Sequence, residues 1–357
     1  MMEDEQLRSI LKCVRCGTCR SVCPIFEELG WESFSTRGRM MIAKGISEGM
    51  DLDESIIDSI NTCTTCGICE EMCPAGAIPP DVFENIRHEI VEMGKETESQ
   101  KDLRENTLST GNPMNETHPR LEWLMEQRDV PDHAENVYFV GCLGSYRYQE
   151  TVLRTYDLIS DLDVTVLPDE VCCGSPLLRT GSDAGELIAH NVRQMEEVGA
   201  HTMIASCAGC YNTLKNDYPD RFRVVHITEF LAENLDKLEL ERLDITVTYH
   251  DPCHLGRANR IFDAPRKLIT AVCELREMRT SRENARCCGG GGGVRKGYPE
   301  LSKALTEKRV AEVPEGVDYI VTCCPLCRTN MAPFSEIPVI DLLDLLTWAQ
   351  KKNKELN

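Results

Sequence analysis

Cysteine is the residue that most constrains this chain, because 20 of its 357 residues are cysteines. A density this high is typical of small secreted domains held by disulfides, but such domains are far shorter. The N-terminus reads MMEDEQLRSI, which is acidic where a secretory signal would be basic and then apolar. No apolar run approaches the roughly eighteen residues that span a bilayer. We therefore expect a cytoplasmic protein with no direct membrane insertion, in which clustered cysteines bind metal.

The chain is also strongly acidic, since 59 Asp and Glu residues against 39 Lys and Arg residues give a net charge of −20. This charge would repel nucleic acid and anionic lipid, so we expect neither as a direct partner. Solubility is the simplest meaning of such a charge. An anionic substrate would need a local basic pocket that works against the overall field.

Composition divides the chain into segments. Residues 95–119, KETESQKDLRENTLSTGNPMNETHP, contain few apolar side chains and predict an exposed linker. Cysteine groups lie on both sides of this segment, in residues 13–73, 142–210 and 253–327. We expect an N-terminal domain, a polar linker and two further domains, over residues 1–94, 95–130, 131–240 and 241–357.

The periodicity of apolar residues changes after the linker. In the N-terminal domain, apolar residues recur on one helical face in 52–60 and 82–93, and Pro79 and Pro80 predict a helix start. Beyond the linker, β-branched runs alternate with helical patterns. Strands are expected at 137–140, 164–167, 202–206, 245–249 and 318–322, with helices such as 186–198 and 299–311 between them. The predicted fold is α+β overall: an α-helical domain followed by two α/β, Rossmann-like domains with mostly parallel sheets.

The second half of the chain contains an internal repeat, which indicates a duplicated domain. CLG, CCGS and CAGC, which begin at Cys142, Cys172 and Cys207, correspond to CHLG, CCGG and CPLC, which begin at Cys253, Cys287 and Cys324. Four of the expected strands lead directly into cysteine-bearing loops, and open α/β sheets bind ligands at the carboxyl ends of their strands. We expect the two copies to pack with their cysteine loops facing each other.

The N-terminal cysteines form two copies of C-x2-C-x2-C-x3-C-P, the run of two-cluster ferredoxins, in which the fourth cysteine ligates the other cluster. One cubane 4Fe–4S cluster is expected on Cys13, Cys16, Cys19 and Cys73. The other is expected on Cys63, Cys66, Cys69 and Cys23. Zinc is the alternative, but two complete copies that end in Cys-Pro are hard to explain as zinc ribbons. Arg37 and Arg39, between the runs, either offset cluster charge or belong to a solvated turn.

Each repeat copy supplies five cysteines, including an adjacent pair. The first set is Cys142, Cys172, Cys173, Cys207 and Cys210. The second set is Cys253, Cys287, Cys288, Cys324 and Cys327. Five thiolates exceed the four that a cubane cluster or a tetrahedral zinc ion uses, and adjacent cysteines suit two irons of a more open cluster. Spacing alone therefore favours an unusual metal centre in each copy.

These copies resemble the cysteine-rich CCG domain family, and their fusion to a ferredoxin module resembles the D-subunit family of CoB–CoM heterodisulfide reductases. The stretches that carry the resemblance are CCGSPLLRTG at 172–181, SCAGCYNTLKNDYP at 206–219, YHDPCHLGR at 249–257 and CCGGGGGVR at 287–295. The resemblance implies that each set of five cysteines holds a non-cubane 4Fe–4S cluster. It also implies a catalytic iron–sulfur subunit that reduces the CoM-S-S-CoB disulfide to two thiols, with electrons relayed through the cubane clusters to the non-cubane clusters. Zinc in the first copy, whose spacing is slightly short, is the alternative.

Six further residues near these motifs are singled out. Cys273 lies on an apolar stripe and is expected to be a buried structural thiol. Cys323 occupies the position of Ser206 and is either a neighbour of the cluster or interchangeable with Cys324 as ligand. His254, Arg257, Arg295 and Arg328 each stand close to a ligand cysteine and could bind an anionic substrate, with loop hydrogen bonding and helix capping as the alternative. The glycines at 289–293 predict close approach of the backbone to a cluster, since no Lys-Ser or Lys-Thr follows.

The chain contains no flavin or nicotinamide motif, so its electrons must come from a partner. The resemblance implies a hetero-oligomer in which a membrane b-type cytochrome or a flavoprotein donates electrons, with the chain peripheral to the membrane through that partner. The alternative function is an electron-transfer subunit of a flavin-linked 2-hydroxy-acid or glycerol-3-phosphate dehydrogenase that passes electrons to a quinone or similar carrier. The presence of all five cysteines in the first copy favours the reductase over the electron-transfer subunit.

Overall fold

The N-terminal part of the molecule is helical in the computed structural model, which describes residues 4–356. Local sequence sets where its helices begin. The Asp53 carboxylate accepts a hydrogen bond from the Ile56 amide, and Pro79 and Pro80 occupy the first turn of the helix that they open. The helices of this part are α1 (Asp4–Lys12), α2 (Thr18–Val22), α3 (Pro24–Leu29), α4 (Thr36–Ser47), α5 (Glu54–Asn61), α6 (Ile68–Glu71) and α7 (Pro79–Glu92), with the 3-10 turn η1 (Glu32–Phe34).

The first α/β unit contains a four-stranded parallel sheet in the order β2-β1-β3-β4. Phe139 lies opposite Ala205, which lies opposite His226, so the strands end together at one edge. The strands are β1 (Asn136–Phe139), β2 (Val164–Thr165), β3 (Thr202–Ala205) and β4 (Arg223–His226). The helices are α10 (Gly141–Arg147), α11 (Gln149–Ile159), α12 (Ser175–Thr180), α13 (Gly185–Val198), α14 (Ala208–Asn216) and α15 (Ile227–Glu233), with η2 (Ser160–Leu162) and η3 (Leu235–Lys237).

The second α/β unit repeats this topology in the order β6-β5-β7-β8, again with parallel strands. Its strands are β5 (Thr246–Tyr249), β6 (Glu274–Leu275), β7 (Tyr319–Thr322) and β8 (Val339–Asp341). Its helices are α16 (Gly256–Asn259), α17 (Asp263–Val272), α18 (Val294–Gly297), α19 (Pro299–Val310), α20 (Pro325–Met331) and α21 (Leu342–Leu356), with η4 (Arg282–Asn284) and η5 (Ala332–Phe334). The expected duplication and parallel sheets are confirmed.

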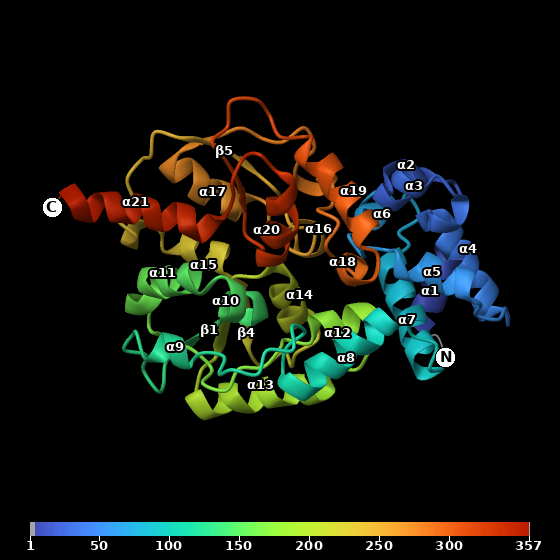
Figure 1. Ribbon diagram of the computed structural model, residues 1–357, viewed down its shortest axis with the longest axis horizontal. Helices are drawn as coiled ribbons and strands as arrows, with labels where there is room; N and C mark the ends of the chain where they lie inside the picture. The colour runs from blue at the N-terminus through green and yellow to red at the C-terminus, as the bar shows by residue number, and fades with distance from the viewer. Residues whose placement is uncertain (1–3, 357) are drawn as a thin grey trace.

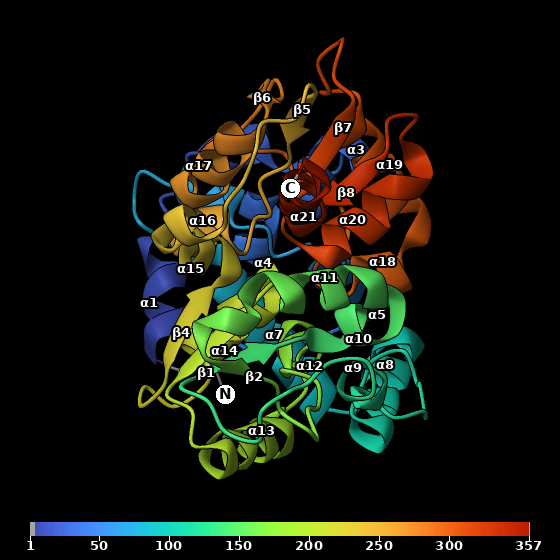
Figure 2. The same ribbon diagram turned by 90° about the vertical axis from the view of Figure 1, so that its left-hand side faces the viewer.

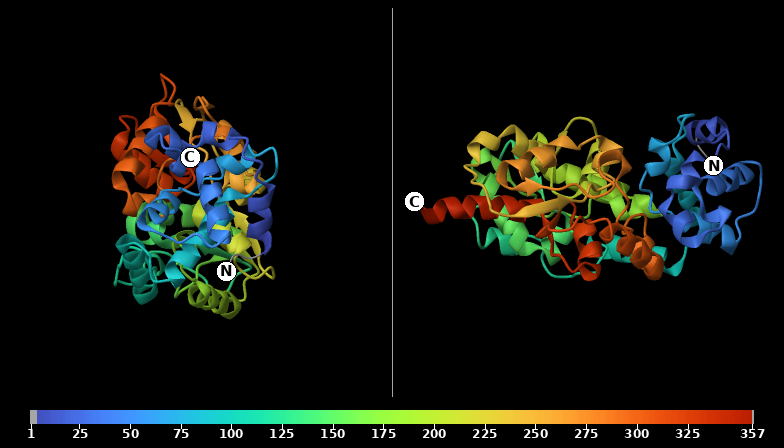
Figure 3. Two further views of the ribbon diagram at one scale, coloured as in Figure 1. Left: turned by 90° about the vertical axis from the view of Figure 1, so that its right-hand side faces the viewer. Right: turned by 90° about the horizontal axis from the view of Figure 1, so that it is seen from above.

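The two α/β units share one core, and the N-terminal helices cap one end of them. Helix α15 of the first unit packs on α17 of the second, and α21 of the second packs on α11 of the first. One apolar cluster runs through both sheets as a result. The two units stack on each other in Figures 1 and 2, and Figure 3 shows that α21 points away from the end that carries the N-terminal helices. Within the described residues, no helix is both long and apolar enough to cross a membrane.

The five strands expected from the sequence are present, and three more, β4, β6 and β8, were not foreseen. They are two to four residues long, too short to show a clear alternation of apolar and polar residues. The expected helices at 186–198 and 299–311 correspond to α13 and α19. The domain boundaries at residues 94, 130 and 240 stay predictions.

The expectation of an exposed linker over 95–119 is wrong, because much of it is helix α8 (Glu98–Thr110). Thr97 and Gln100 form a capping box at its start. Gln100 is buried, accepts a hydrogen bond from Asn61 at 2.9 Å and donates one to the Thr180 carbonyl at 2.9 Å. The polar side chains of this segment therefore join the N-terminal part to the first α/β unit. Further along the expected linker, α9 (Glu122–Met125) packs into the shared core through Leu124.

Candidate metal centre

The two ferredoxin-type runs bring their cysteines close to one another, and the crossed assignment of Cys73 to the first set and Cys23 to the second stays a prediction. Burial, together with the neighbouring thiols of Cys13, Cys23, Cys16 and Cys73, raises the pKa of Cys19 to about 11. Burial also raises the pKa of Cys69, with smaller effects from Cys66, Cys63 and Cys23. Gly17 and Gly67 start the short helices α2 and α6 in a left-handed conformation, which turns the loop around each set of thiols.

The five cysteines of the first α/β unit converge at the carboxyl ends of its strands. Their thiols lie in a string of interacting neighbours, and the cysteines in order are Cys142, Cys172, Cys173, Cys210 and Cys207. Hydrogen bonds from Cys172 and Cys210 lower the pKa of the central thiol, Cys173, to about 6. Hydrogen bonds to Cys173 and Cys207 raise the pKa of Cys210.

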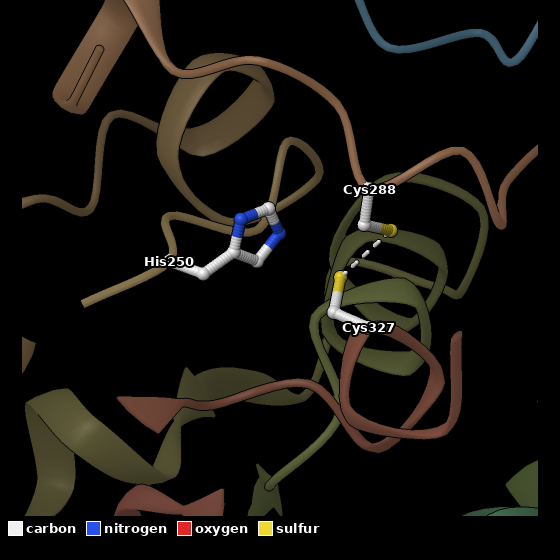
Figure 4. A group of neighbouring side chains, drawn as sticks. All are labelled: His250, Cys288 and Cys327. Carbon is white, nitrogen blue, oxygen red and sulfur yellow. Dashed lines mark hydrogen bonds between the residues drawn. The ribbon is translucent and has the colours of Figure 1, made fainter. Parts of the chain in front are cut away.

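The second α/β unit repeats this string with its own five thiols. In order they are Cys253, Cys287, Cys288, Cys327 and Cys324. The sulfurs of Cys288 and Cys327 lie 3.4 Å apart, and His250 lies beside them (Figure 4). The last thiols of the two strings, Cys207 and Cys324, also hydrogen-bond to each other. The expectation that the cysteine loops of the two copies face each other is therefore confirmed.

The string continues from the second α/β unit into the N-terminal part. A hydrogen bond between the thiols of Cys66 and Cys287 is the main cause that raises the pKa of Cys66. Arg257 lies at this junction, donates a hydrogen bond to the Cys66 carbonyl at 2.8 Å, and has its pKa raised by the charges of Cys66, Cys253 and Cys287 despite its burial. This junction is the direct connection between the two kinds of cysteine site.

Both strings border one cavity of about 1050 Å³, which is lined by all ten cysteines of the α/β units. Its wall also includes five basic side chains: Arg147, Arg179, Arg295, Lys296 and Lys303. In the described part of the chain, no Asp or Glu is among the lining residues. For a protein with a net charge of −20, this is a strong local reversal of charge that favours anions.

The basic side chains of the cavity differ in how far acidic partners neutralise them. Arg179 pairs with Glu84 and Asp217, Arg147 pairs with Glu116 and Lys296 pairs with Asp102. By contrast, Arg295 and Lys303 are exposed and form no ion pair with any side chain of residues 5–350. These two cations are available to meet an anion at the mouth of the cavity.

Two buried arginines that no motif indicated hold the cysteine loops in place. Arg120, inside the expected linker, donates a hydrogen bond to the Cys142 sulfur at 3.2 Å and forms an ion pair with Glu170 at 3.0 Å. Arg87 is fully buried and donates to the carbonyls of Cys63 and Arg179 at 2.6 Å and of Gly292 at 3.1 Å.

A signal for Arg87 was present in the sequence, since it interrupts an apolar helical stripe that includes Phe83, Ile86 and Ile90. Arg120 had no comparable signal. The glycine run lets the backbone at Gly292 approach the Cys63 loop, because a Cβ on Gly292 would lie 2.5 Å from the Cys63 carbonyl oxygen. This close approach brings the carbonyls of Gly292 and Cys63 within reach of the same Arg87 guanidinium. The predicted close approach of this run is thus an approach to the loop that carries the second ferredoxin-type run.

The four residues singled out as anion binders lie in different surroundings. Arg295 lines the cavity mouth, and His254 lines its wall with a pKa that burial lowers to about 4. Arg257 instead bonds main-chain carbonyls at the junction of the two cysteine sites. Arg328 does not line the cavity, and it pairs with Asp344 at 3.0 Å. Of these four, Arg295 and His254 are therefore placed to meet a ligand there.

The remaining residues singled out have structural contacts. Cys273 is buried, and its thiol donates to the Ile269 carbonyl. Cys323 lies 2.8 Å from the Tyr249 hydroxyl, as Ser206 lies 3.1 Å from the Tyr138 hydroxyl. Arg39 is fully buried and bonds the Ser59 carbonyl, whereas Arg37 pairs with Glu32 near the surface.

The donor set fits iron–sulfur clusters. Each α/β unit gathers five sulfurs whose burial and mutual hydrogen bonds oppose ionisation of all of them, as the raised pKa values of Cys142, Cys210 and Cys327 show. Bound metal cations would offset the cost of ionising all five thiols, because thiolates are the form that ligates metal. All twenty cysteines lie in the described residues and none forms a disulfide.

Comparison with known proteins gives matches along the whole chain. The sequence profile of the 4Fe–4S dicluster domain matches residues 9–77, and that of the cysteine-rich (CCG) domain matches 136–215 and 247–332. The D subunit of the dihydromethanophenazine:CoB–CoM heterodisulfide reductase of Methanosarcina barkeri is 34% identical over 96% of this chain and 95% of its own. Its namesake from Methanosarcina mazei is 33% identical over 95% and 92%. The B subunit of the fumarate reductase (CoM/CoB) of Methanothermobacter marburgensis is 35% identical over 59% and 46%.

Proposed function

Because the chain belongs to the family of CoB–CoM heterodisulfide reductase D subunits, we propose that it is the catalytic iron–sulfur subunit of a complex that reduces the CoM-S-S-CoB disulfide. The reaction breaks one S–S bond, consumes two electrons and two protons, and releases each sulfur as a thiol. The observation that carries the proposal is the single cavity of about 1050 Å³ bordered by both sets of five cysteines.

The proposed cluster ligands are the eighteen cysteines that converge. Two cubane clusters are assigned to the crossed ferredoxin-type sets, Cys13, Cys16, Cys19 and Cys73, and Cys63, Cys66, Cys69 and Cys23. Two non-cubane clusters are assigned to the strings of five in the α/β units. When bound, these clusters would supply one-electron carriers and irons that can take up substrate sulfur.

The protein's own side chains are suited to an anionic disulfide. Arg295 and Lys303 provide positive charge at the cavity mouth that no acidic side chain of residues 5–350 neutralises by an ion pair. Leu103, Met114 and Phe334 provide apolar surface in the same wall, which suits an aliphatic arm on the substrate. The thiols of Cys207 and Cys324 lie where the two strings meet, so a disulfide held there would face both units at once.

The N-terminal part is suited to receive electrons from a partner protein. Cys16 is exposed at the surface, whereas Cys66 lies buried against Cys287 of the second α/β unit. The path from the exposed thiol to the cavity thus runs through parts of the protein that pack directly on one another. We propose that an electron-donating partner covers the exposed ferredoxin-type run and completes a hetero-oligomer.

The proposal is tested by anaerobic reconstitution of the full chain with iron and sulfide. Four clusters correspond to about 16 iron atoms per chain, and reduced viologen should be oxidised only when CoM-S-S-CoB is added. Cys210→Ser should lose both iron and turnover. The matched control is Cys323→Ser, which places in the second unit the serine that the first unit carries as Ser206 and should keep both.

The electron-transfer alternative gives a different outcome. Full iron loading and reduction of the chain without any disulfide-dependent oxidation would refute the reductase proposal. About eight iron atoms per chain, all lost on substitution of the N-terminal cysteines, would show that the α/β units hold no cluster. Zinc in the first unit would appear as one metal ion that Cys210→Ser removes.

A further inference from the structure

His250 lies directly after strand β5 and behind the thiol string of the second α/β unit. Its side chain is 1% exposed, and it is not among the residues that line the cavity. One ring nitrogen of His250 lies within 4.8 Å of the sulfurs of Cys288 and Cys327. Figure 4 shows the imidazole directed toward these two sulfurs, with its second nitrogen turned away. One imidazole beside two thiols has the composition of a metal site, so His250 is either a metal ligand or a residue that acts on the neighbouring cysteines.

Arg309 decides which nitrogen of His250 carries the proton. Its Nε donates a hydrogen bond to His250 Nδ1 at 2.9 Å. A guanidinium can only donate, so Nδ1 must be the acceptor and is unprotonated. The neutral ring then carries its hydrogen on Nε2.

The position of Arg309 is itself fixed. Its side chain is fully buried and donates to the Thr280 carbonyl at 2.8 Å and to the Glu312 carboxylate at 2.8 Å. Glu312 is held by Arg279 and Arg286 as well. The guanidinium therefore cannot turn to release Nδ1 without breaking a buried ion-pair network.

The remaining nitrogen, Nε2, has no conventional hydrogen-bond partner in the described chain although it is buried. A buried N–H without an acceptor is costly, and the sulfur of Cys288 is the group beside it. We infer that His250 is not a metal ligand but a positioning residue, whose Nε2–H hydrogen-bonds the Cys288 thiolate and thereby tunes the cluster that Cys288 ligates. The inference rests on the proposed cluster ligation by Cys288, not on the identity of the disulfide.

The first α/β unit lacks this device. Tyr138 and Tyr249 occupy equivalent positions, because they bond the equivalent residues Ser206 and Cys323. The residue after Tyr138 is Phe139, so a phenyl ring stands where the second unit has the imidazole of His250. Phe139 is buried too, which shows that an aromatic ring without donors fits this place in the fold.

This comparison supplies the variants for the test. His250→Phe removes the donor and reproduces the residue of the first unit. His250→Gln keeps an N–H near the place of Nε2 and a carbonyl oxygen that can accept from Arg309. Hydrogen bonds to cluster sulfurs stabilise the reduced, more negative state. We expect His250→Phe to weaken one-electron reduction of one cluster about tenfold, which corresponds to about 59 mV, and His250→Gln to restore most of it.

Two measurements on the full chain decide the matter. The ¹⁵N shifts of the histidines in the reduced, metal-free chain should show one neutral ring protonated at Nε2, and this pattern should vanish in His250→Phe. A spectroscopic redox titration of the reconstituted variants should show the shift in potential with unchanged iron content.

The contrary results are equally distinct. A ring protonated at Nδ1, or potentials that His250→Phe leaves unchanged at full iron content, would overturn the inference. Iron lost in both variants would identify His250 as a ligand and overturn it too. Failure of the proposed function would appear separately, as a fully loaded wild-type chain that does not turn over the disulfide.

Discussion

Replacement of Arg87 by methionine should weaken the docking of the N-terminal part on the two α/β units. The guanidinium donates hydrogen bonds to carbonyls of all three parts: Ile60, Asn61 and Cys63 in the N-terminal part, Arg179 in the first unit and Gly292 in the second. Methionine fills a similar volume but donates no hydrogen bond. The variant therefore leaves several buried carbonyl groups without a donor at the point where the three parts meet.

The size of the effect follows from these contacts. Two of the five hydrogen bonds, those to Arg179 and Gly292, cross from the N-terminal part to the α/β units and so contribute to docking, each by about 1 kcal/mol net. Part of that sum is offset, because burial of the charge is costly and lowers the pKa of Arg87. A net loss of about 1.4 kcal/mol in docking free energy makes transient opening about tenfold more frequent, since each 1.4 kcal/mol is a factor of ten.

Hydrogen exchange by mass spectrometry measures this opening. Peptides covering 60–66, 176–183 and 288–297 should exchange about tenfold faster in Arg87→Met, while the strands of both sheets keep their rates. Arg39→Met is the matched control, because Arg39 is also fully buried but bonds only Ser59 and Thr62 within the N-terminal part. Equal rates at 288–297 in Arg87→Met and wild type would refute the role assigned to Arg87.

Three further perturbations test other parts of the account. Arg295→Ala should raise the KM for the anionic disulfide about tenfold, as expected for loss of one charge-assisted contact, with kcat retained in steady-state assays; an unchanged KM would remove Arg295 from the binding site. Gly292→Ala should weaken docking of the N-terminal part and speed hydrogen exchange at 288–297, because the new Cβ would lie 2.5 Å from the Cys63 carbonyl oxygen. Gly30→Ala is the control, since Gly30 also has a positive φ but nothing lies within 4 Å of its Cβ position, and it should leave exchange at 288–297 unchanged. Burial, followed by the charge of Asp344, raises the pKa of Asp341 to about 7. The native state therefore keeps a proton that the unfolded state has released. The free energy of unfolding of the wild type should fall by about 1.4 kcal/mol per pH unit relative to Asp341→Asn as the pH rises to about 7, and should fall no further above that pH. Urea unfolding of the metal-free chain at pH 5.5, 6.5 and 7.5 checks this, and parallel curves for the two proteins would contradict it.

Much of the candidate site could be predicted because thiol ligation imposes short, regular spacing. The strands that lead into Cys142, Cys207, Cys253 and Cys324 were foreseen, and so was the meeting of the two cysteine copies. These features depend on local sequence and on a topological rule for parallel sheets. The structure adds the order in which the thiols contact one another and the contact between Cys66 and Cys287.

The features that sequence reasoning missed depend on contacts between distant segments. The polar composition of 95–119 is that of a linker, yet Gln100 and Thr107 are buried because their polar groups find partners in α8 and in neighbouring parts. Arg120 donates to the sulfur of Cys142, 22 residues further along the chain, and Arg257 bonds the Cys66 carbonyl in the N-terminal part, not only its neighbour Cys253. No periodicity records such pairings, since each is satisfied only after the parts have packed.

The most direct test of the central claim is the stoichiometry of disulfide reduction by the anaerobically reconstituted full chain. Each CoM-S-S-CoB consumed should take two electrons from reduced viologen and release two thiols. Loss of a cysteine from either string of five, Cys210→Ser or Cys327→Ser, should abolish this turnover, while Cys323→Ser should retain it. Undiminished turnover with either string disrupted, or none in a wild-type chain carrying about 16 iron atoms, would contradict the account.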